Sequence, residues 1–170
     1  METPSHRAHK EHADRHIACA VITVSDTRTA ETDKSGQLIR TMLEQGGHRV
    51  SAYQIVKDEP SQIGPMVKTL LERADVDALI INGGTGVARR DVTFDVVSRM
   101  VEKTLPGFGE LFRHFSLAEI GSAAMLSRAM AGTLGGKVLF SIPGSSGAVR
   151  LAMEKLILAE MPHIVFELRK

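Results

Sequence analysis

The stretch VDALIINGGTG, residues 76–86, joins a run of apolar residues to a loop that is rich in glycine. Consecutive apolar positions are typical of a strand that is buried on both faces of a parallel sheet. Gly83, Gly84 and Gly86 tolerate positive φ, so the backbone N–H groups of this loop are able to face a ligand. In α/β sheets, ligands bind beyond the carboxyl ends of the strands. The stretch therefore predicts an α/β fold with a ligand site at this loop.

The rest of the chain alternates between strand and helix patterns in the same way. Apolar or alternating runs predict strands at residues 17–25 and 48–56, and a further strand within residues 135–145. This alternation predicts a three-layer α/β/α sandwich with a mostly parallel central sheet. The first predicted helix covers 36–45 with Ser35 as its cap, the second runs from Pro60 or Ser61 to about Ala74, and the third runs from its cap Thr93 to about Lys103. A fourth predicted helix covers 106 through 130. The last covers 146–159, and Pro162 is expected to break it.

The composition is that of an ordinary globular protein, with 43% hydrophobic and 24% charged residues among 170. This length suits one domain, which we place at residues 16–170 after a flexible polar arm at residues 1–15. The 21 basic and 20 acidic residues nearly balance, so there is no general attraction to nucleic acid or to membranes. No apolar run is long enough to cross a bilayer and no secretory signal is recognisable, so we expect a cytoplasmic protein.

The N-terminal arm carries His6, His9 and His12, and His16 follows directly. Such a group of histidines suggests either a metal site or a mobile basic arm. No cluster of cysteines or carboxylates nearby completes a coordination shell, and chain termini are commonly loose. The sequence therefore favours the mobile arm.

Four polar loops follow the predicted strands, and their sequences are TVSDTRT, VKDEPS, NGGTGVARRD and SIPGSSG. Because the strands are mostly parallel, we expect these loops to line one crevice. The first loop contributes Ser25 and Asp26. The last loop, with Pro143, Gly144 and Ser145, resembles a strand-to-helix turn whose helix N-terminus suits an anion.

Taken alone, the glycine loop has two interpretations. Its N–H groups and the hydroxyl of Thr85 form a nest that binds phosphate, or the loop is a purely structural turn. It is not a Walker loop, because no Lys-Ser or Lys-Thr pair follows at the required spacing. It is not a dinucleotide fingerprint either, because G-x-G-x-x-G is absent.

Asp91, between the glycine loop and the next helix, favours the binding interpretation. It is able to cap that helix, but Thr93 is also available for this role. A carboxylate beside a phosphate nest repels the ligand unless a cation intervenes, and Mg²⁺ binds one or two carboxylates together with phosphate oxygens. This suggests a metal–nucleotide substrate. Asp58 and Glu59 are the second acidic candidates. Their alternative role is an interaction with the N-terminal end of a helix dipole, and spacing alone does not place Asp58 near Asp91.

Three arginines are candidates for binding phosphate. Arg89 and Arg90 follow the glycine loop, where they either neutralise phosphate or lie exposed in solvent. Arg128, after Ser127, is able to pair with phosphate or carboxylate through its forked guanidinium, or to serve as a partly buried structural residue. Ser127 and Ser145 are poor candidates for a hydrolase nucleophile, because no G-x-S-x-G elbow is present and no motif places a histidine as base.

Taken together and in this order, these segments resemble the molybdenum cofactor biosynthesis family that includes MoaB, MogA and the gephyrin G domain. The set is far more specific than any one loop. Its segments PGFGELFR, EIG and SRAMAG resemble the MoaB branch more closely than MogA or gephyrin. The resemblance implies a compact α/β/α sandwich, which agrees with the pattern of elements. The similar segments span about residues 17–163 and read TVSDTRT, DKSG, GGHRV, VKDE, NGGTG with RDVT, PGFGELFR, EIGSAAMLSRAMAG and IPGS.

This resemblance implies a molybdopterin-binding domain that transfers AMP from Mg-ATP to the terminal phosphate of molybdopterin and releases pyrophosphate. The two essential aspartates of the family fall on Asp58 and Asp91, which we expect to be catalytic and to hold Mg²⁺ through the phosphates of ATP. The positions expected to bind the pterin and the phosphates are Ser25, Asp26, Gly83, Gly84, Thr85, Gly86, Ser127, Arg128, Pro143, Gly144 and Ser145.

Two places depart from the family pattern. The family usually continues RD-x-T-P-E, whereas Phe94 and Asp95 replace the proline and glutamate here. The last turn reads PGSSGAVR, where a proline or lysine often follows the serine, so nucleotide or pterin contacts there are less secure. The aspartate after VK favours an active enzyme. The alternative is a catalytically silent molybdopterin-binding or scaffold protein of the same pathway, and in either case the resemblance implies a homotrimer or homohexamer.

Overall fold

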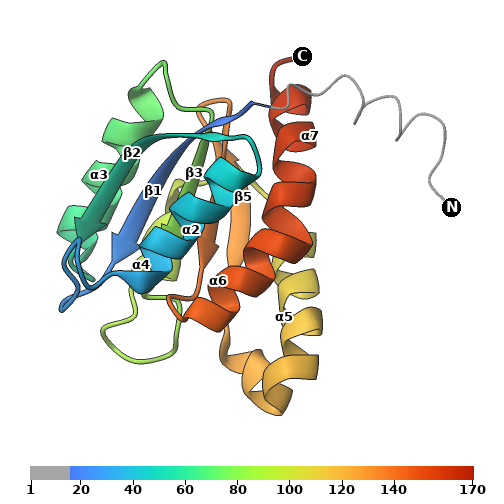
Figure 1. The fold of residues 1–170 in the computed structure, drawn as a ribbon. Coiled ribbons are helices and arrows are strands. Elements are labelled where there is room, and N and C mark those ends of the chain that lie inside the picture. The colour runs from blue at the N-terminus through green and yellow to red at the C-terminus, as the bar shows by residue number, and fades with distance from the viewer. Residues whose placement is uncertain (1–15) are drawn as a thin grey trace, which may run out of the picture.

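The computed structural model describes residues 16–170, which form a six-stranded sheet covered by helices on both faces (Figure 1). The strand order is β2-β1-β3-β6-β5-β4. The strands are β1 Ala18–Val24, β2 Arg49–Val56, β3 Ala78–Asn82, β4 Lys103–Thr104, β5 Met130–Leu134 and β6 Lys137–Ile142. The helices are α2 Lys34–Gln45, α3 Pro60–Glu72, α4 Thr93–Met100, α5 Pro106–Ile120, η1 Gly121–Leu126, α6 Ser146–Ala152, η2 Met153–Ile157 and α7 Leu158–Leu168.

Four neighbouring strands of the sheet, β2, β1, β3 and β6, are parallel. β5 pairs antiparallel with β6, and the short β4 pairs antiparallel with β5 at the edge. All residues of β1 and β3 are buried, as expected for central strands that carry helices on both faces. The predicted α/β/α sandwich with a mostly parallel sheet is confirmed.

Alternate side chains of the sheet enter two separate hydrophobic cores. Ile80 of β3 packs in the core formed with α2, α5, α6 and α7, whereas Leu79 and Ile81 pack in the core formed with α3 and α4. This is the period-two alternation of a strand, because successive side chains point to opposite faces. The two cores fix the sheet between its helical layers, and the loops at the strand ends are left to form a site.

The prediction of one helix from 106 through 130 is wrong. α5 ends at Ile120, and a 3₁₀ segment follows that begins at Gly121, where φ is 63°. Residues 130–134 form β5 instead, which pairs with β6 across a turn at Gly135 and Gly136. Both turn glycines have positive φ, which two-residue hairpins require. The two glycines before β6 therefore mark a hairpin. Pairing of β5 with β6 outweighs the helical pattern of the small residues that precede the glycines.

Other helix boundaries differ as well. Ser35 lies inside α2, and Asp33 is its cap, because the Asp33 carboxylate accepts a hydrogen bond from Gly36 N–H at 3.0 Å. α4 ends at Met100 rather than near residue 103, where β4 begins. Pro162 does not break the last helix but lies inside α7. Burial of neighbouring α7 side chains in the core outweighs the hydrogen bond that a proline removes.

The predicted arm, residues 1–15, lies outside the described residues, as do His6, His9 and His12. The adjoining His16 is described, and its Nδ1 lies 2.7 Å from the carbonyl oxygen of Gly47. Within residues 16–170, no helix combines the length and the apolar character needed to cross a membrane.

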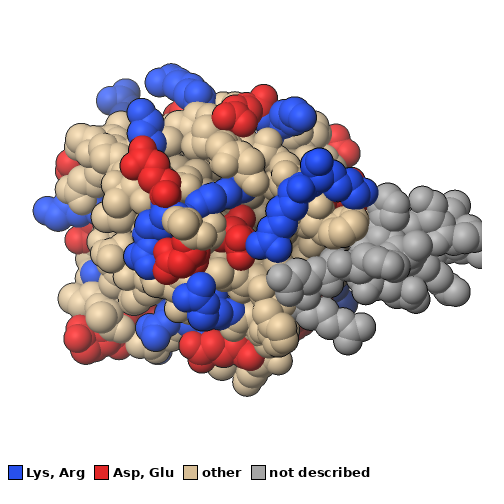
Figure 2. All heavy atoms as spheres, turned by 90° about the horizontal axis from the view of Figure 1, so that it is seen from above, with Lys and Arg blue, Asp and Glu red and all other residues tan. Residues whose placement is uncertain are grey.

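At the end of the sheet where the parallel strands begin, basic and acidic side chains are interspersed over the surface (Figure 2). Among the residues just before β3, Arg73 pairs with Asp75 at 2.8 Å, and Asp77 pairs with Arg169 of the C-terminus at 2.8 Å. The candidate site lies at the opposite end of the sheet, where the same strands end.

Candidate functional site

The loops that follow β1, β2, β3 and β6 start from one edge of the sheet. Val24, the last residue of β1, pairs with Val56, the last residue of β2. On the other side Thr23 of β1 pairs with Asn82, and Asn82 pairs with Ile142 of β6. Because the strands end in register, the four polar loops lie next to one another. The prediction that all four line one crevice is only partly confirmed, because the pocket beside the glycine loop is lined by the loops after β3 and β6 and not by those after β1 and β2.

The glycine loop is shaped by close contacts with two carboxylates. Gly83 and Gly84 have φ values of 105° and 61°, which glycine adopts readily. A Cβ on Gly84 would lie 2.6 Å from Asp58 Oδ2, and a Cβ on Gly86 would lie 2.6 Å from Asp91 Oδ2. A side chain at either position would therefore displace a carboxylate, because carboxylate oxygens occupy the space that a Cβ would need.

The same contacts bring Asp58 and Asp91 to one loop, which spacing in the sequence does not predict. Asp58 Oδ1 accepts a hydrogen bond from Val92 N–H at 3.2 Å, just before α4. Asp91 Oδ2 accepts one from Ala88 N–H at 2.9 Å, which closes the turn after the glycines. Each carboxylate is thus fixed by a backbone donor, and both lie beside the proposed phosphate nest.

The electrostatics of Asp58 favour a cation at this place. Burial raises the pKa of Asp58, the hydrogen bond from Val92 N–H opposes this rise, and the negative charges of Asp91 and Asp26 raise the pKa further. Arg90 lowers the pKa by a smaller amount. Ionised carboxylates in such a position repel one another unless a positive charge lies between them.

Thr93, predicted to cap α4, has a different place in the structure. Its backbone N–H donates to the carbonyl of Gly84 at 3.1 Å, and the cap position belongs to Val92. The Thr93 side chain is fully buried, and its Oγ1 lacks a hydrogen-bond partner among residues 16–170. Of the atoms near Gly84, this hydroxyl is the closest to where a Cβ would lie, followed by the Asp58 carboxylate.

Two carboxylates and an unpartnered hydroxyl suit a hydrated Mg²⁺, which binds oxygen ligands and keeps several waters. The described part of the chain has no group of three or more His, Cys, Asp or Glu side chains arranged to hold a metal. The donor set therefore fits a cation that arrives with substrate phosphates better than a resident metal with a complete protein shell.

Ser25 and Asp26, the predicted binding residues of the first loop, are engaged within the protein. Ser25 Oγ accepts a hydrogen bond from Arg28 N–H at 3.2 Å. Asp26 Oδ1 accepts one from Asp58 N–H at 3.2 Å, and Asp26 Oδ2 lies 2.6 Å from Arg90 Nη2. The hydrogen bond from Arg90 lowers the pKa of Asp26. The first loop thus connects the segment that carries Asp58 to the segment that carries Arg90.

A pocket of about 360 Å³ lies beside the glycine loop, within the usual size range of small-molecule sites. It brings together most of the predicted binding residues, but Gly83, Asp58, Ser25, Asp26 and Arg128 are outside its lining. The predicted residues that do line it are Gly84, Thr85, Gly86, Asp91, Ser127, Pro143, Gly144 and Ser145.

The opposite wall of this pocket comes from α5 and η1 and was not among the predicted site residues. It includes Phe112, Ser116 and Glu119, together with Ile120 and Leu126, whose side chains are more than half exposed. All of these positions except Ser116 fall in segments that resemble the family. Nothing in their local pattern distinguishes a pocket wall from a solvent-exposed helix face.

A buried network around Asp33 was also missed by the sequence analysis. The Asp33 side chain is fully buried, and it accepts hydrogen bonds from Thr23 Oγ1 at 2.5 Å and from the Tyr53 hydroxyl at 2.6 Å. Burial opposes ionisation of Asp33, but these hydrogen bonds and that from Gly36 N–H outweigh it and lower the pKa. Burial and then the Asp33 carboxylate raise the pKa of Tyr53 to about 12.

Arg28 connects this network to the pocket. Its Nη1 pairs with Asp33 Oδ1 at 3.2 Å and contacts Ser35, and its Nη2 donates to the carbonyl of Gly144 at 3.0 Å. A Cβ on Gly144 would in turn lie 3.2 Å from Gly83 Cα. The loops after β1, β3 and β6 are thereby held together. The sequence signal for this arrangement is the DKSG segment, in which Asp33 stands three residues before Gly36, as a helix cap does. This signal predicts the cap but not the contacts of Asp33 with other loops.

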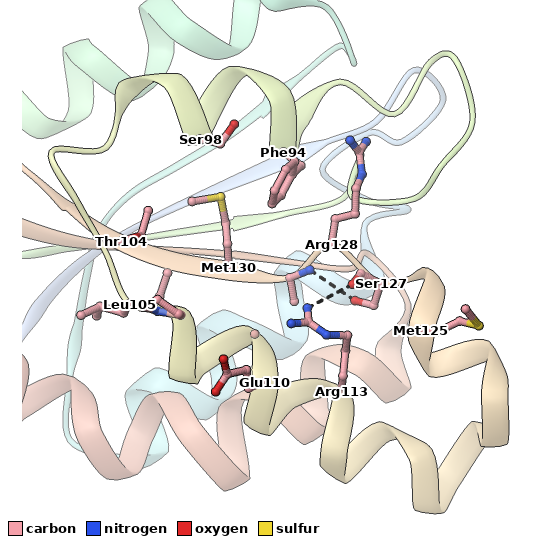
Figure 3. A pocket seen from close by; sticks show the side chains of 14 residues that line it. Phe94, Ser98, Thr104, Leu105, Glu110, Arg113, Met125, Ser127, Arg128 and Met130 are labelled. Atoms are coloured by element: carbon pink, nitrogen blue, oxygen red, sulfur yellow. Dashed lines mark hydrogen bonds between the residues drawn. The ribbon is translucent and has the colours of Figure 1, made fainter.

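A second cavity, of about 420 Å³, shares Ser127 and lies between α4 and α5 (Figure 3). Phe94 and Arg128 lie side by side on one part of its wall, and Arg113 of α5 points toward Ser127 from the other (Figure 3). Arg113 Nη1 donates to the Ser127 carbonyl at 3.4 Å. Arg128 therefore lies at the border of this second cavity rather than in the pocket beside the glycine loop.

Comparisons with known proteins show the family to which the chain belongs. Residues 20–163 match the family described as "probable molybdopterin binding domain". The chain is 55% identical over 163 residues to molybdenum cofactor biosynthesis protein B of Bacillus cereus, covering 95% of this chain and 96% of that protein.

Solved structures show the same relationship. A crystal structure of a molybdenum cofactor biosynthesis protein B is 56% identical with a TM-score of 0.89, covering 91% of this chain and 96% of that one. The tungsten cofactor synthesizing protein MoaB from Pyrococcus furiosus is 36% identical with a TM-score of 0.81, covering 93% and 100%. The chain therefore belongs to the molybdopterin-binding domain family of molybdenum cofactor biosynthesis proteins, in its MoaB branch.

Proposed function

We propose that this protein binds molybdopterin and Mg-ATP and transfers AMP to the terminal phosphate of the pterin. The observation that carries the proposal is the position of Asp58 and Asp91, whose carboxylates lie against Gly84 and Gly86 of the same loop. Two carboxylates beside a loop of backbone N–H donors suit a nucleotide triphosphate with its Mg²⁺. The adjoining pocket is large enough for a small substrate.

In this reaction an oxygen of the pterin phosphate attacks the α-phosphorus of ATP. A new P–O bond forms to that oxygen, the bond between the α- and β-phosphates breaks, and pyrophosphate leaves with its electron pair. The attacking phosphate is already ionised near neutral pH, so no general base is required. The protein must bring two polyanions together, which depends on position and on neutralised charge.

Each group of residues has a part in this scheme. Asp58 and Asp91 hold Mg²⁺, which neutralises phosphate charge and aligns the phosphates when bound. The N–H groups of residues 84–86 and the hydroxyl of Thr85 bind phosphate oxygens, whereas the Gly83 N–H donates to the carbonyl of Ile142 at 3.0 Å. Ser127 and the turn at 143–145 contact the pterin or nucleotide from the other side of the pocket.

The test is a turnover assay with purified protein, molybdopterin and Mg-ATP, which measures release of pyrophosphate. Asp58→Asn and Asp91→Asn keep the size of each side chain and remove its charge. We expect either substitution to lower turnover by about 10²-fold or more, while binding of molybdopterin changes much less. Unchanged turnover in Asp91→Asn would exclude the assigned role of that residue.

The alternative is a molybdopterin-binding or scaffold protein of the same pathway without turnover. One observation favours an interaction role in addition to a catalytic one. Large apolar side chains of α5 and η1 are exposed, namely Leu111, Leu117, Ile120, Met125 and Leu126. Binding of molybdopterin without release of pyrophosphate would support this alternative.

The same apolar surface supports an assembly of identical chains. We define this α5–η1 surface by the five side chains named above. Its five side chains are each 48% exposed or more, and large apolar patches commonly mark interfaces. A homotrimer or homohexamer is therefore part of the proposal, and we add a cytoplasmic location to it as a separate expectation.

A further inference from the structure

We propose that Arg128 is a positioning residue which, with Phe94 and Asp95, forms a clamp that holds the segment carrying Asp91 against the glycine loop. The functional consequence rests on the proposed function, because it assumes that Asp91 acts on the substrates. The contacts that form the clamp can be tested without any substrate.

The guanidinium of Arg128 is occupied by acceptors of the protein on all three nitrogens. Nε donates to the carbonyl of Gly86 at 2.9 Å, and Nη2 donates to the carbonyl of Asp91 at 2.6 Å. Nη1 lies 2.9 and 3.1 Å from the two carboxylate oxygens of Asp95. The backbone N–H of Arg128 also donates to the carbonyl of Thr85 at 3.2 Å. This set of contacts favours a positioning role over direct binding of phosphate.

The two carbonyls that Arg128 bridges are the ends of an exposed excursion of the chain. Residues 87–90 between them are exposed, and Val87 retains 68% of its accessible surface. The Asp91 carboxylate packs directly against Gly86, because a Cβ on Gly86 would lie 2.6 Å from Asp91 Oδ2. A change in the distance between the backbones of Gly86 and Asp91 would therefore move the carboxylate relative to the glycine loop. One guanidinium that holds both carbonyls therefore holds the carboxylate as well.

Both residues that depart from the family pattern contact this arginine. The Arg128 guanidinium carbon lies 5.0 Å from the centroid of the Phe94 ring, within the range of a cation–π contact. Asp95 forms the ion pair from the first turn of α4. A proline at position 94 offers no aromatic ring for this contact. Phe94 and Asp95 thus contact the same guanidinium, one through its ring and the other through its carboxylate (Figure 3 shows the ring beside the guanidinium).

Hydrogen exchange measured by mass spectrometry on the full chain, without ligands, tests the clamp. The variants are Arg128→Gln and Asp95→Asn, and the matched control is Arg73→Gln. Arg73 also binds a carboxylate and a backbone carbonyl, those of Asp75 and Ser51, but at the opposite end of the sheet.

We expect the amides of residues 86–92 to exchange about tenfold faster or more in Arg128→Gln. In the wild-type protein, local opening of this segment must break the hydrogen bonds from Arg128 to both carbonyls, and without these bonds opening costs less free energy. Asp95→Asn should give a smaller increase in the same peptide, since the two carbonyl contacts and the Phe94 contact remain. Arg73→Gln should leave residues 86–92 unchanged. Arg128→Lys should not restore protection, because a single ammonium cannot replace three nitrogens in a fixed plane.

Unchanged exchange at residues 86–92 in both clamp variants overturns the proposal. So does faster exchange spread evenly over all helices and strands, which indicates a general structural role. If Arg128→Gln does not fold, the exchange of Asp95→Asn alone tests the clamp. The Asp95 side chain is 49% exposed, so we expect this variant to fold. If the wild-type protein releases no pyrophosphate, the proposed function fails, while the exchange result still decides whether the clamp exists.

Discussion

Gly84 and Asp58 lie so close together that a Cβ on Gly84 would be 2.6 Å from Asp58 Oδ2. The glycine loop and the loop after β2 are distant in the sequence, and this contact joins them into one site. The φ value of 61° at Gly84 is a second and independent reason for glycine at this position.

Gly84→Ala should therefore destabilise the protein by about 1–3 kcal/mol, because alanine meets backbone strain, the buried Thr93 hydroxyl and the Asp58 carboxylate. Displacement of Asp58 should also lower turnover. Urea unfolding and the pyrophosphate assay measure the two effects. Gly107→Ala in α5 is the control, since a Cβ there meets no atom within 4 Å. Equal stability of both variants would show that the contact carries no strain.

Asp58→Asn should increase stability at neutral pH although it lowers turnover. The folded-state pKa of Asp58 is raised, so its ionised form is less favourable in the folded protein than in the unfolded chain. The cost of Asp58 ionisation is therefore absent below the unfolded pKa of about 3.8, and it grows as the pH rises through the folded pKa.

Urea unfolding of wild type and Asp58→Asn at several pH values checks this prediction. The advantage of the variant should be largest near pH 7 and should disappear at low pH. Asparagine keeps an oxygen acceptor for Val92 N–H, so loss of that hydrogen bond does not obscure the comparison. A variant that is less stable than wild type at pH 7 contradicts the assignment of a raised pKa.

Asp33→Asn should have the opposite effect on stability. The pKa of Asp33 is lowered, so its contribution is present above the unfolded pKa and is lost as the pH falls through the lower folded value. Removing this buried charge weakens the hydrogen bonds from Thr23 and Tyr53 and leaves Arg28 without its ion pair. We expect a loss of about 2–4 kcal/mol at pH 7.

Thermal and urea unfolding of Asp33→Asn and Tyr53→Phe measure this network. Tyr53→Phe removes one hydrogen bond only and should cost about 1 kcal/mol. If Asp33→Asn costs no more than Tyr53→Phe, then the carboxylate is not the centre of the network.

Leu117→Asp should change the assembly of the protein if the α5–η1 surface joins identical chains. Leu117 is 57% exposed, so the substitution needs no change in the core of the chain. A charge in an apolar interface remains unpaired and weakens association. Size-exclusion chromatography with light scattering should show a smaller species than wild type. Thr69→Asp, on an exposed position of α3 on the other face of the sheet, should leave the mass unchanged.

The sequence was a good guide where local patterns decide the structure. The apolar run before Gly83 is indeed a central strand, and the four polar loops do share one edge. It failed at residues 130–134, because a short buried strand next to small residues has no periodicity that separates it from a helix. It also named Thr93 as a cap, whereas a side chain from another loop, that of Asp58, accepts the hydrogen bond at this helix end.

The sequence by itself determined the four parallel strands, the glycine loop and the acidic candidates, because these depend on residue type and on spacing along the chain. Only the tertiary structure decided that the carboxylates of Asp58 and Asp91 both contact the glycine loop. It also decided that Arg28 links three loops through Asp33 and Gly144, and that the Arg128 guanidinium binds the carbonyls of Gly86 and Asp91. These relationships join residues that are far apart in the sequence. They follow from the register of the parallel strands and from the packing of the loops at the strand ends, neither of which a local pattern encodes.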